Sequence, residues 1–126
     1  MSLHVLVLVG SLRAGSTIAQ LADAAIAHLP AGVDGTVFAR LAELPHYSED
    51  LDHDDSLPEV ARDLREVVAD ADAVLLVSPE YNGSLPGVLK NAVDWVSRPR
   101  GAAAIAGKPA AVIGASGSPR GAQWAR

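Results

Sequence analysis

Apolar residues fall into short runs and periodic stretches that alternate along the chain. Residues 3–9 read LHVLVLV, an apolar, β-branched run whose pattern leaves no face for water, which predicts a strand covered on both sides. Strands are predicted at residues 3–9, 33–39, 73–77 and 110–113, the second being the weakest. Between them, apolar residues recur at helical spacing in residues 18–29, 57–68 and 85–96. Such alternation predicts an α/β fold, a parallel sheet with helices on both faces.

Helix ends carry their own signals. Pro30 and Gly32 end the first helix. Ser56 and Glu59 have the spacing of a capping box, so Ser56 is the expected N-cap of the second helix. Ser84 is the expected cap of the third helix.

Composition narrows the class of protein. A chain of 126 residues predicts one domain, and 49% hydrophobic residues are enough for a core. The net charge of −5 excludes the basic surface that nucleic acids need. No apolar run approaches the roughly 20 residues of a membrane span, and the first residues lack the basic region of a secretory signal, so we expect a cytoplasmic protein. With no cysteine, disulfides, thiolate metal sites and a cysteine nucleophile are excluded, and any chemistry needs other groups or a cofactor.

The loop after the first strand has the features of an anion site. Residues 10–16, GSLRAGS, lead into a helix N-terminus, where backbone N–H groups and the helix dipole favour negative charge. Further donors come from Ser11, Arg13, Ser16 and Thr17. Ser16 stands where a Walker A loop has lysine, and the glycines do not match G-x-G-x-x-G. A single terminal phosphate fits this loop better than a pyrophosphate, and an ordinary capped turn is the alternative.

Two more loops follow the third and fourth strands, at the sheet edge where parallel α/β folds bind ligands. Residues 78–87, SPEYNGSLPG, could present backbone amides and the ring of Tyr81 to a planar heterocycle, with Asn82 bonding to ring heteroatoms. A simple turn is the alternative. Residues 114–121, GASGSPRG, are small enough for a ligand to approach the backbone, and they do not form a nucleophile elbow.

Three segments together resemble the NADPH-dependent FMN reductase family, which includes quinone and chromate reductases: GSLRAGS, SPEYNGSLPGVLKNAVDWVSRP and GKPAAVIGASGSPRGAQWA. The resemblance implies a flavodoxin-like, doubly wound parallel sheet with strand order 2-1-3-4. It implies FMN as cofactor, NADPH or NADH as electron donor, and a quinone, free flavin or similar molecule as acceptor. It also implies a homodimer or homotetramer.

The resemblance assigns roles to residues by position. Contacts to the FMN phosphate are expected from Ser11, Arg13, Ser16, Thr17 and Ile18. The isoalloxazine is expected to lie beside Pro79, Glu80, Tyr81, Asn82 and Gly83, with Ser116 and Gly117 on the far side. Ile18 stands where many relatives have asparagine, so we expect weaker FMN affinity. No catalytic side chain is predicted, because the cofactor supplies the chemistry.

A flavodoxin-like sheet also has a fifth strand flanked by two helices, about 40 residues for which this sequence has no counterpart. We therefore expect residues 1–126 to be one FMN-binding domain that is incomplete at its C-terminus, with the fourth strand at an exposed edge. A non-catalytic remnant of the fold is one alternative function. A flavodoxin-type electron carrier is another, although five aromatics and a charge of −5 fit it less well.

Other residues invite interpretation as sites. We expect the acidic segment 49–55 to be a solvated loop before a helix and not a metal site. Trp95 is expected to pack in the core or at an interface. Arg98 and Arg100 suit the C-terminus of the third helix, and contact with a nucleotide phosphate is the alternative.

Overall fold

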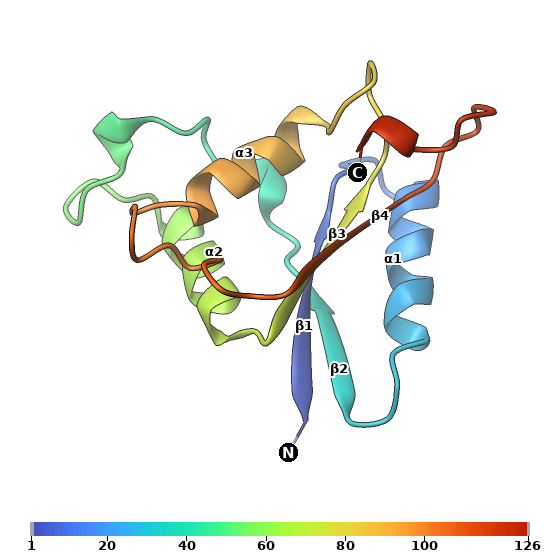
Figure 1. Cartoon of the computed structure of the whole chain (residues 1–126). Helices are drawn as coiled ribbons and strands as arrows, with labels where there is room; N and C mark the ends of the chain where they lie inside the picture. Colours follow the sequence, from blue (N-terminus) through green and yellow to red (C-terminus); the bar gives the residue numbers. More distant parts are fainter. Residues whose placement is uncertain (1, 126) are drawn as a thin grey trace.

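The computed structural model describes residues 2–125 and contains a four-stranded parallel sheet (Figure 1). Its strands are β1 (Leu3–Val9), β2 (Val33–Val37), β3 (Ala73–Ser78) and β4 (Ala110–Gly114). Their order is β2-β1-β3-β4, which confirms the predicted 2-1-3-4 arrangement. Of the helices, α1 (Thr17–Ala27) lies on one face, and α2 (Glu59–Asp70) and α3 (Gly87–Val96) lie on the other. Short 3-10 helices lie between β2 and α2, at η1 (Leu41–Glu43) and η2 (Glu49–Leu51), and after β4, at η3 (Gln123–Ala125).

The strand register brings the carboxyl ends of three strands together. Val9 at the end of β1 lies beside Val77 of β3, and Ser78 lies beside Gly114 at the end of β4. Since all pairs are parallel, the loops that follow these strands emerge at the same edge of the sheet. This edge positions the candidate site.

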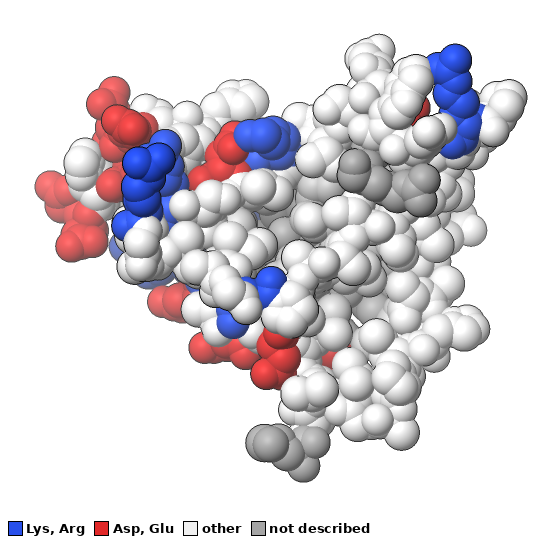
Figure 2. All heavy atoms as spheres, in the orientation of Figure 1, with Lys and Arg blue, Asp and Glu red and all other residues white. Residues whose placement is uncertain are grey.

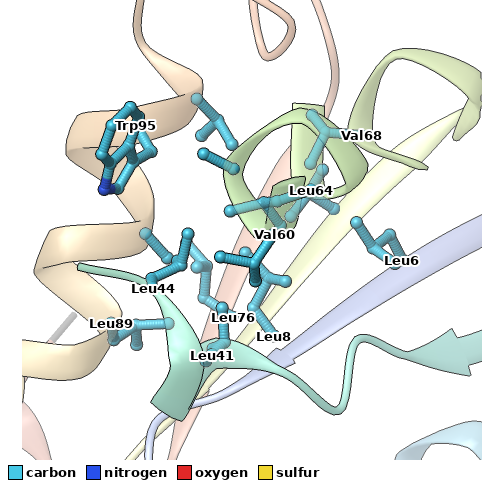
Figure 3. Close-up of a cluster of buried hydrophobic side chains, with 14 of the residues drawn as sticks. Leu6, Leu8, Leu41, Leu44, Val60, Leu64, Val68, Leu76, Leu89 and Trp95 are labelled. Atoms are coloured by element: carbon cyan, nitrogen blue, oxygen red, sulfur yellow. The ribbon is translucent and has the colours of Figure 1, made fainter. Parts of the chain in front are cut away.

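The larger part of the core lies between the sheet and the α2–α3 layer. Leu8, Leu64, Leu89 and Trp95 are completely buried there. Figure 3 shows side chains from both layers meeting: Leu6, Leu8 and Leu76 from the sheet, Val60, Leu64 and Val68 from α2, Leu89 and Trp95 from α3. Burying each large aliphatic side chain contributes about 1.5–3 kcal/mol to the stability of the fold. This packing holds the strands from which the site loops emerge.

The predicted capping box at Ser56 is wrong. Helix α2 begins at Glu59, its N-cap is Pro58, and no side chain caps it. A proline disfavours helical geometry in the residue before it, here Leu57, so the helix cannot extend back to Ser56. The Ser56 hydroxyl instead donates to the carbonyl of Asp50 at 3.3 Å.

The predicted cap at Ser84 is also wrong, for the same reason. Helix α3 begins at Gly87 after the N-cap Pro86. Ser84 belongs to a turn, where its N–H donates to the carbonyl of Tyr81 at 3.1 Å. The loop after β3 is therefore longer and more structured than the pattern of apolar residues suggested.

Charge is unevenly distributed over the face shown in Figure 2. Acidic and basic side chains gather on the side that carries α2, and the surface along β4 and α1 is almost uncharged. Among residues 2–125, no helix is both long and apolar enough to cross a membrane.

Candidate functional site

The loops after β1, β3 and β4 enclose an open cavity of about 480 Å³, within the usual range for small-molecule sites. All the residues predicted to hold a cofactor line it except Asn82 and Gly83. The lining residues from that prediction are Ser11, Arg13, Ser16, Thr17, Ile18, Pro79, Glu80, Tyr81, Ser116 and Gly117. The fold thus brings together residues that are up to 106 positions apart in the sequence, since 117 − 11 = 106.

One wall of the cavity is the N-terminus of α1. Ser16 is the N-cap, and its buried hydroxyl oxygen accepts a hydrogen bond from the N–H of Ala19 at 3.0 Å. The first N–H groups of a helix have no partner within it, and this cap satisfies only one of them. Those of Thr17 and Ile18 are available to a ligand at the cavity wall. Arg13 lies in the preceding loop and forms no ion pair with any residue that the structure describes.

Ile18 belongs both to the core beneath α1 and to the border of the cavity. Its side chain is 4% exposed and belongs to the cluster of Val7, Ala22 and Val77 between α1 and the sheet. The residue also borders the cavity. Its side chain therefore anchors the first turn of α1 on the sheet.

The loop after β3 contains a tight two-residue turn. Tyr81 and Ser84 exchange backbone hydrogen bonds, each at 3.1 Å. Between them, Asn82 and Gly83 both have positive φ, 53° and 75°. Asn-Gly is the preferred pair for a turn with positive φ at both central residues. The turn leaves Asn82 and Gly83 outside the cavity lining.

The loop after β4 is organised by its own hydrogen bonds. Ser118 donates its N–H to the hydroxyl of Ser116 at 3.2 Å and its own hydroxyl to the carbonyl of Gly121 at 3.2 Å. At the start of the loop, glycine at position 114 avoids a clash, because a Cβ there would lie 2.6 Å from the Cβ of Ala122 and 2.8 Å from the Ser78 carbonyl oxygen. Ser116 and Gly117 are consequently held at the cavity.

The sequence did not predict the contact between the loop after β3 and the segment that follows β4. The N–H of Trp124 donates to Oε1 of Glu80 at 2.7 Å, and the indole lies against Gly83. The guanidinium of Arg120 lies 4.5 Å from the centre of the Trp124 ring. A single tryptophan after a glycine-rich loop gave no periodic signal that could have predicted these contacts.

The acidic segment 49–55 is not simply a solvated loop. Asp52 pairs with Arg65 through two hydrogen bonds of 2.7 and 2.9 Å, and both side chains are 15% exposed. Arg65 and a hydrogen bond from Tyr47 hold the pKa of the Asp52 carboxyl below its usual value. Burial raises the pKa of the Tyr47 hydroxyl, and the hydrogen bond that this hydroxyl donates to Asp52 raises it further. Within residues 2–125, no group of three or more metal-ligating side chains is arranged around one point.

The two side chains at the end of α3 lie away from the cavity. Trp95 is completely buried and donates its indole N–H to the carbonyl of Pro45 at 2.9 Å, which confirms its predicted packing role. Arg98 lies 5.5 Å from the centre of the Tyr47 ring and 3.9 Å from Glu49. Arg98 does not contribute to the cavity between the three loops.

Comparisons with known proteins agree on one family. A family model described as NADPH-dependent FMN reductase matches residues 3–126. A 2-hydroxy-1,4-benzoquinone reductase from a Burkholderia species is 50% identical over 116 residues, which cover 92% of this chain and 62% of that protein. A quinone reductase from Escherichia coli K12 is 40% identical over 96 residues, 76% of this chain and 51% of that protein.

A solved structure is also similar. The flavoenzyme NAD(P)H:(acceptor) oxidoreductase FerB from Paracoccus denitrificans superposes with a TM-score of 0.88 at 41% identity. The match covers 97% of this chain and 65% of FerB. The chain therefore spans between about half and two thirds of the length of these proteins.

Proposed function

Because the chain belongs to the NADPH-dependent FMN reductase family, we propose that it binds FMN between its β1, β3 and β4 loops and serves electron transfer from NADPH or NADH to a quinone-type acceptor. The observation that carries this proposal is the convergence of these loops on one cavity of about 480 Å³. Quinone-type acceptors are supported by the names of two relatives.

The donors at the start of α1 suit a phosphate monoester. The free N–H groups of Thr17 and Ile18, the positive end of the helix dipole and the Arg13 guanidinium would hold its negative charge. Ser16 keeps these groups in place by capping the helix, and its hydroxyl hydrogen remains free to donate. Loop one thus fits the phosphate end of FMN.

The opposite wall suits a flat ring system. Pro79, Glu80 and Tyr81 of the β3 loop line the cavity together with the small residues Ser116 and Gly117 of the β4 loop. Ser78 stiffens the start of this wall, because its buried hydroxyl donates to the carbonyl of Pro79 at 2.7 Å. These residues would orient a ring and limit its contact with water.

Bound FMN supplies hydride and electron transfer, so the protein needs no acid, base or nucleophile of its own. The contribution of this chain is to bind the phosphate, orient the ring and leave one side open to small molecules. A homodimer or homotetramer remains a prediction from the family resemblance, and a cytoplasmic location remains a prediction from the sequence.

The direct test uses the purified chain and FMN under anaerobic conditions. We expect stoichiometric binding, measured by flavin fluorescence, followed by loss of the flavin absorbance when NADPH is added and its recovery when a benzoquinone is added. Failure to bind FMN would refute the proposal. Binding without reduction by NADPH or NADH would favour the flavodoxin-type electron carrier, which receives electrons from a protein.

A further inference from the structure

We propose that Trp124 is a positioning residue that fastens the β3 loop of the proposed FMN site, an inference that rests on the proposed function. Trp124 does not line the cavity. It acts through Glu80 and through the Tyr81–Ser84 turn. Three separate contacts support this role.

The first contact is polar. The backbone N–H of Trp124 donates to the Glu80 carboxylate at 2.7 Å, across 44 residues of sequence. A hydrogen bond to a charged acceptor is short and strong compared with a neutral one. Glu80 lines the cavity on one side and, on the other, a neighbouring hollow formed with Ser118, Pro119 and Arg120. The hydrogen bond from Trp124 therefore holds in place the side chain that separates the cavity from this hollow.

The second contact is steric. A Cβ at residue 83 would lie 3.0 Å from Cε3 of the Trp124 ring, so the indole approaches the turn as closely as glycine permits. Gly83 also has a φ of +75°, which glycine adopts at little cost. The turn thus presents bare backbone to the indole.

The third contact holds the indole itself. Arg120 lies 4.5 Å from the centre of the Trp124 ring, within the range of a cation–π interaction. The indole contacts both this guanidinium and the turn, and 52% of the residue remains exposed. A large, half-exposed aromatic with these contacts joins the β4 loop to the β3 loop without being part of the core.

The joined loops explain how the cavity keeps its shape. Within residues 2–125, the Tyr81–Ser84 turn has only its own two backbone hydrogen bonds, and a lone hairpin turn is marginally stable in water. Trp124 adds a long-range attachment to it. Loss of the indole should loosen residues 80–84 and leave the strands intact, because the core between β3 and α3 does not include Trp124.

The experiment measures amide hydrogen exchange by NMR on the FMN-free protein. We expect Trp124→Ala to speed exchange at the amides of Tyr81 and Ser84 about tenfold, with no change at Val77 in β3. Trp124→Phe keeps a flat ring on the turn and should restore most of the protection. Val67→Ala removes another exposed hydrophobic side chain, on α2, and serves as the matched control with unchanged exchange.

A second variant tests the polar contact. Glu80→Ala removes the acceptor of the Trp124 backbone N–H, a bond that Trp124→Ala retains, so it should also speed exchange at the same amides. The effect of the double variant should be less than the sum of the two single effects, because both contacts join the same two loops. Equal acceleration at Val77 would show a merely structural role and overturn the proposal. Unchanged exchange at Tyr81 and Ser84 in Trp124→Ala would overturn it as well.

FMN provides the link to function. Where the wild type binds FMN, Trp124→Ala should raise the dissociation rate of FMN about tenfold, and Trp124→Phe should restore it. An unaltered rate would overturn the positioning role. Failure of the wild type to bind FMN would refute the proposed function alone, because the exchange measurements decide the attachment without cofactor.

Discussion

Asp52→Asn tests how much the partly buried ion pair between Asp52 and Arg65 contributes to stability. The Asp52 carboxylate accepts two hydrogen bonds from Arg65, at 2.7 and 2.9 Å, and one from the hydroxyl of Tyr47 at 3.0 Å. Arg65 also donates to the carbonyl of Trp95 at 2.9 Å. The substitution removes the charge and one acceptor oxygen, while the shape of the side chain is kept.

The magnitude follows from burial. Ion pairs on the surface contribute at most about 1 kcal/mol, whereas breaking a fully buried pair costs about 3–5 kcal/mol. Both side chains are 15% exposed, and the pair has two-point geometry, which places it between these limits. We expect Asp52→Asn to lower the free energy of unfolding by about 2 kcal/mol.

Urea unfolding at several pH values is the assay. The pKa of Asp52 is lowered by folding, so its stabilisation is complete above the unfolded value of about 3.9 and is lost as pH falls through the folded value. The difference between wild type and Asp52→Asn should be constant near pH 7 and shrink progressively below about pH 4. Lys90→Met is the control, since the Lys90–Asp94 pair lies on the exposed side of α3 and contributes no more than about 0.5 kcal/mol.

Equal costs for Asp52→Asn and Lys90→Met at pH 7 would refute the reasoning. A difference from wild type that stays the same below pH 4 would also refute it, because protonation of Asp52 would then have no part in stability.

Three further substitutions test residues that support the walls of the cavity. Ser16→Ala removes the cap of α1 and should cost about 1 kcal/mol in urea unfolding; an unchanged midpoint would show that the cap contributes nothing. Gly114→Ala forces a Cβ to within 2.8 Å of the Ser78 carbonyl oxygen and 2.6 Å of Ala122, so we expect a loss of about 1–3 kcal/mol in thermal unfolding, and full stability would contradict the close approach. Ile18→Ala empties a buried position and should cost about 2–5 kcal/mol by denaturant titration, in contrast to the small effect expected if the side chain pointed into the cavity.

The sheet was predictable because buried strands leave a strong signal. The runs at residues 3–9, 73–77 and 110–113 became β1, β3 and β4, and the strand order followed from the family resemblance. Helix starts were less predictable. The serine signals at positions 56 and 84 were overridden by the prolines at 58 and 86, which restrict the residue before them.

The candidate site was predictable as a set of loops and not as a set of contacts. Parallel strands dictate that the three loops meet, so most of the expected residues line one cavity. The attachment of Trp124 to Glu80 depends on how two irregular loops pack, and no periodicity encodes such packing. The burial of Asp52 was hidden for a similar reason, because its partner Arg65 lies on another element.

The most direct test of the central claim compares FMN with riboflavin, which has the same ring system and no phosphate, on the wild type and Arg13→Met. Arg62→Met, at an exposed position on α2, is the matched control. If loop one binds the phosphate, Arg13→Met should weaken FMN binding about 10- to 100-fold, the loss of a charge-assisted contact of about 1.5–3 kcal/mol, and leave riboflavin binding unchanged. Equal effects on both flavins, or wild-type binding that does not distinguish them, would contradict the assignment of the α1 N-terminus as the phosphate site.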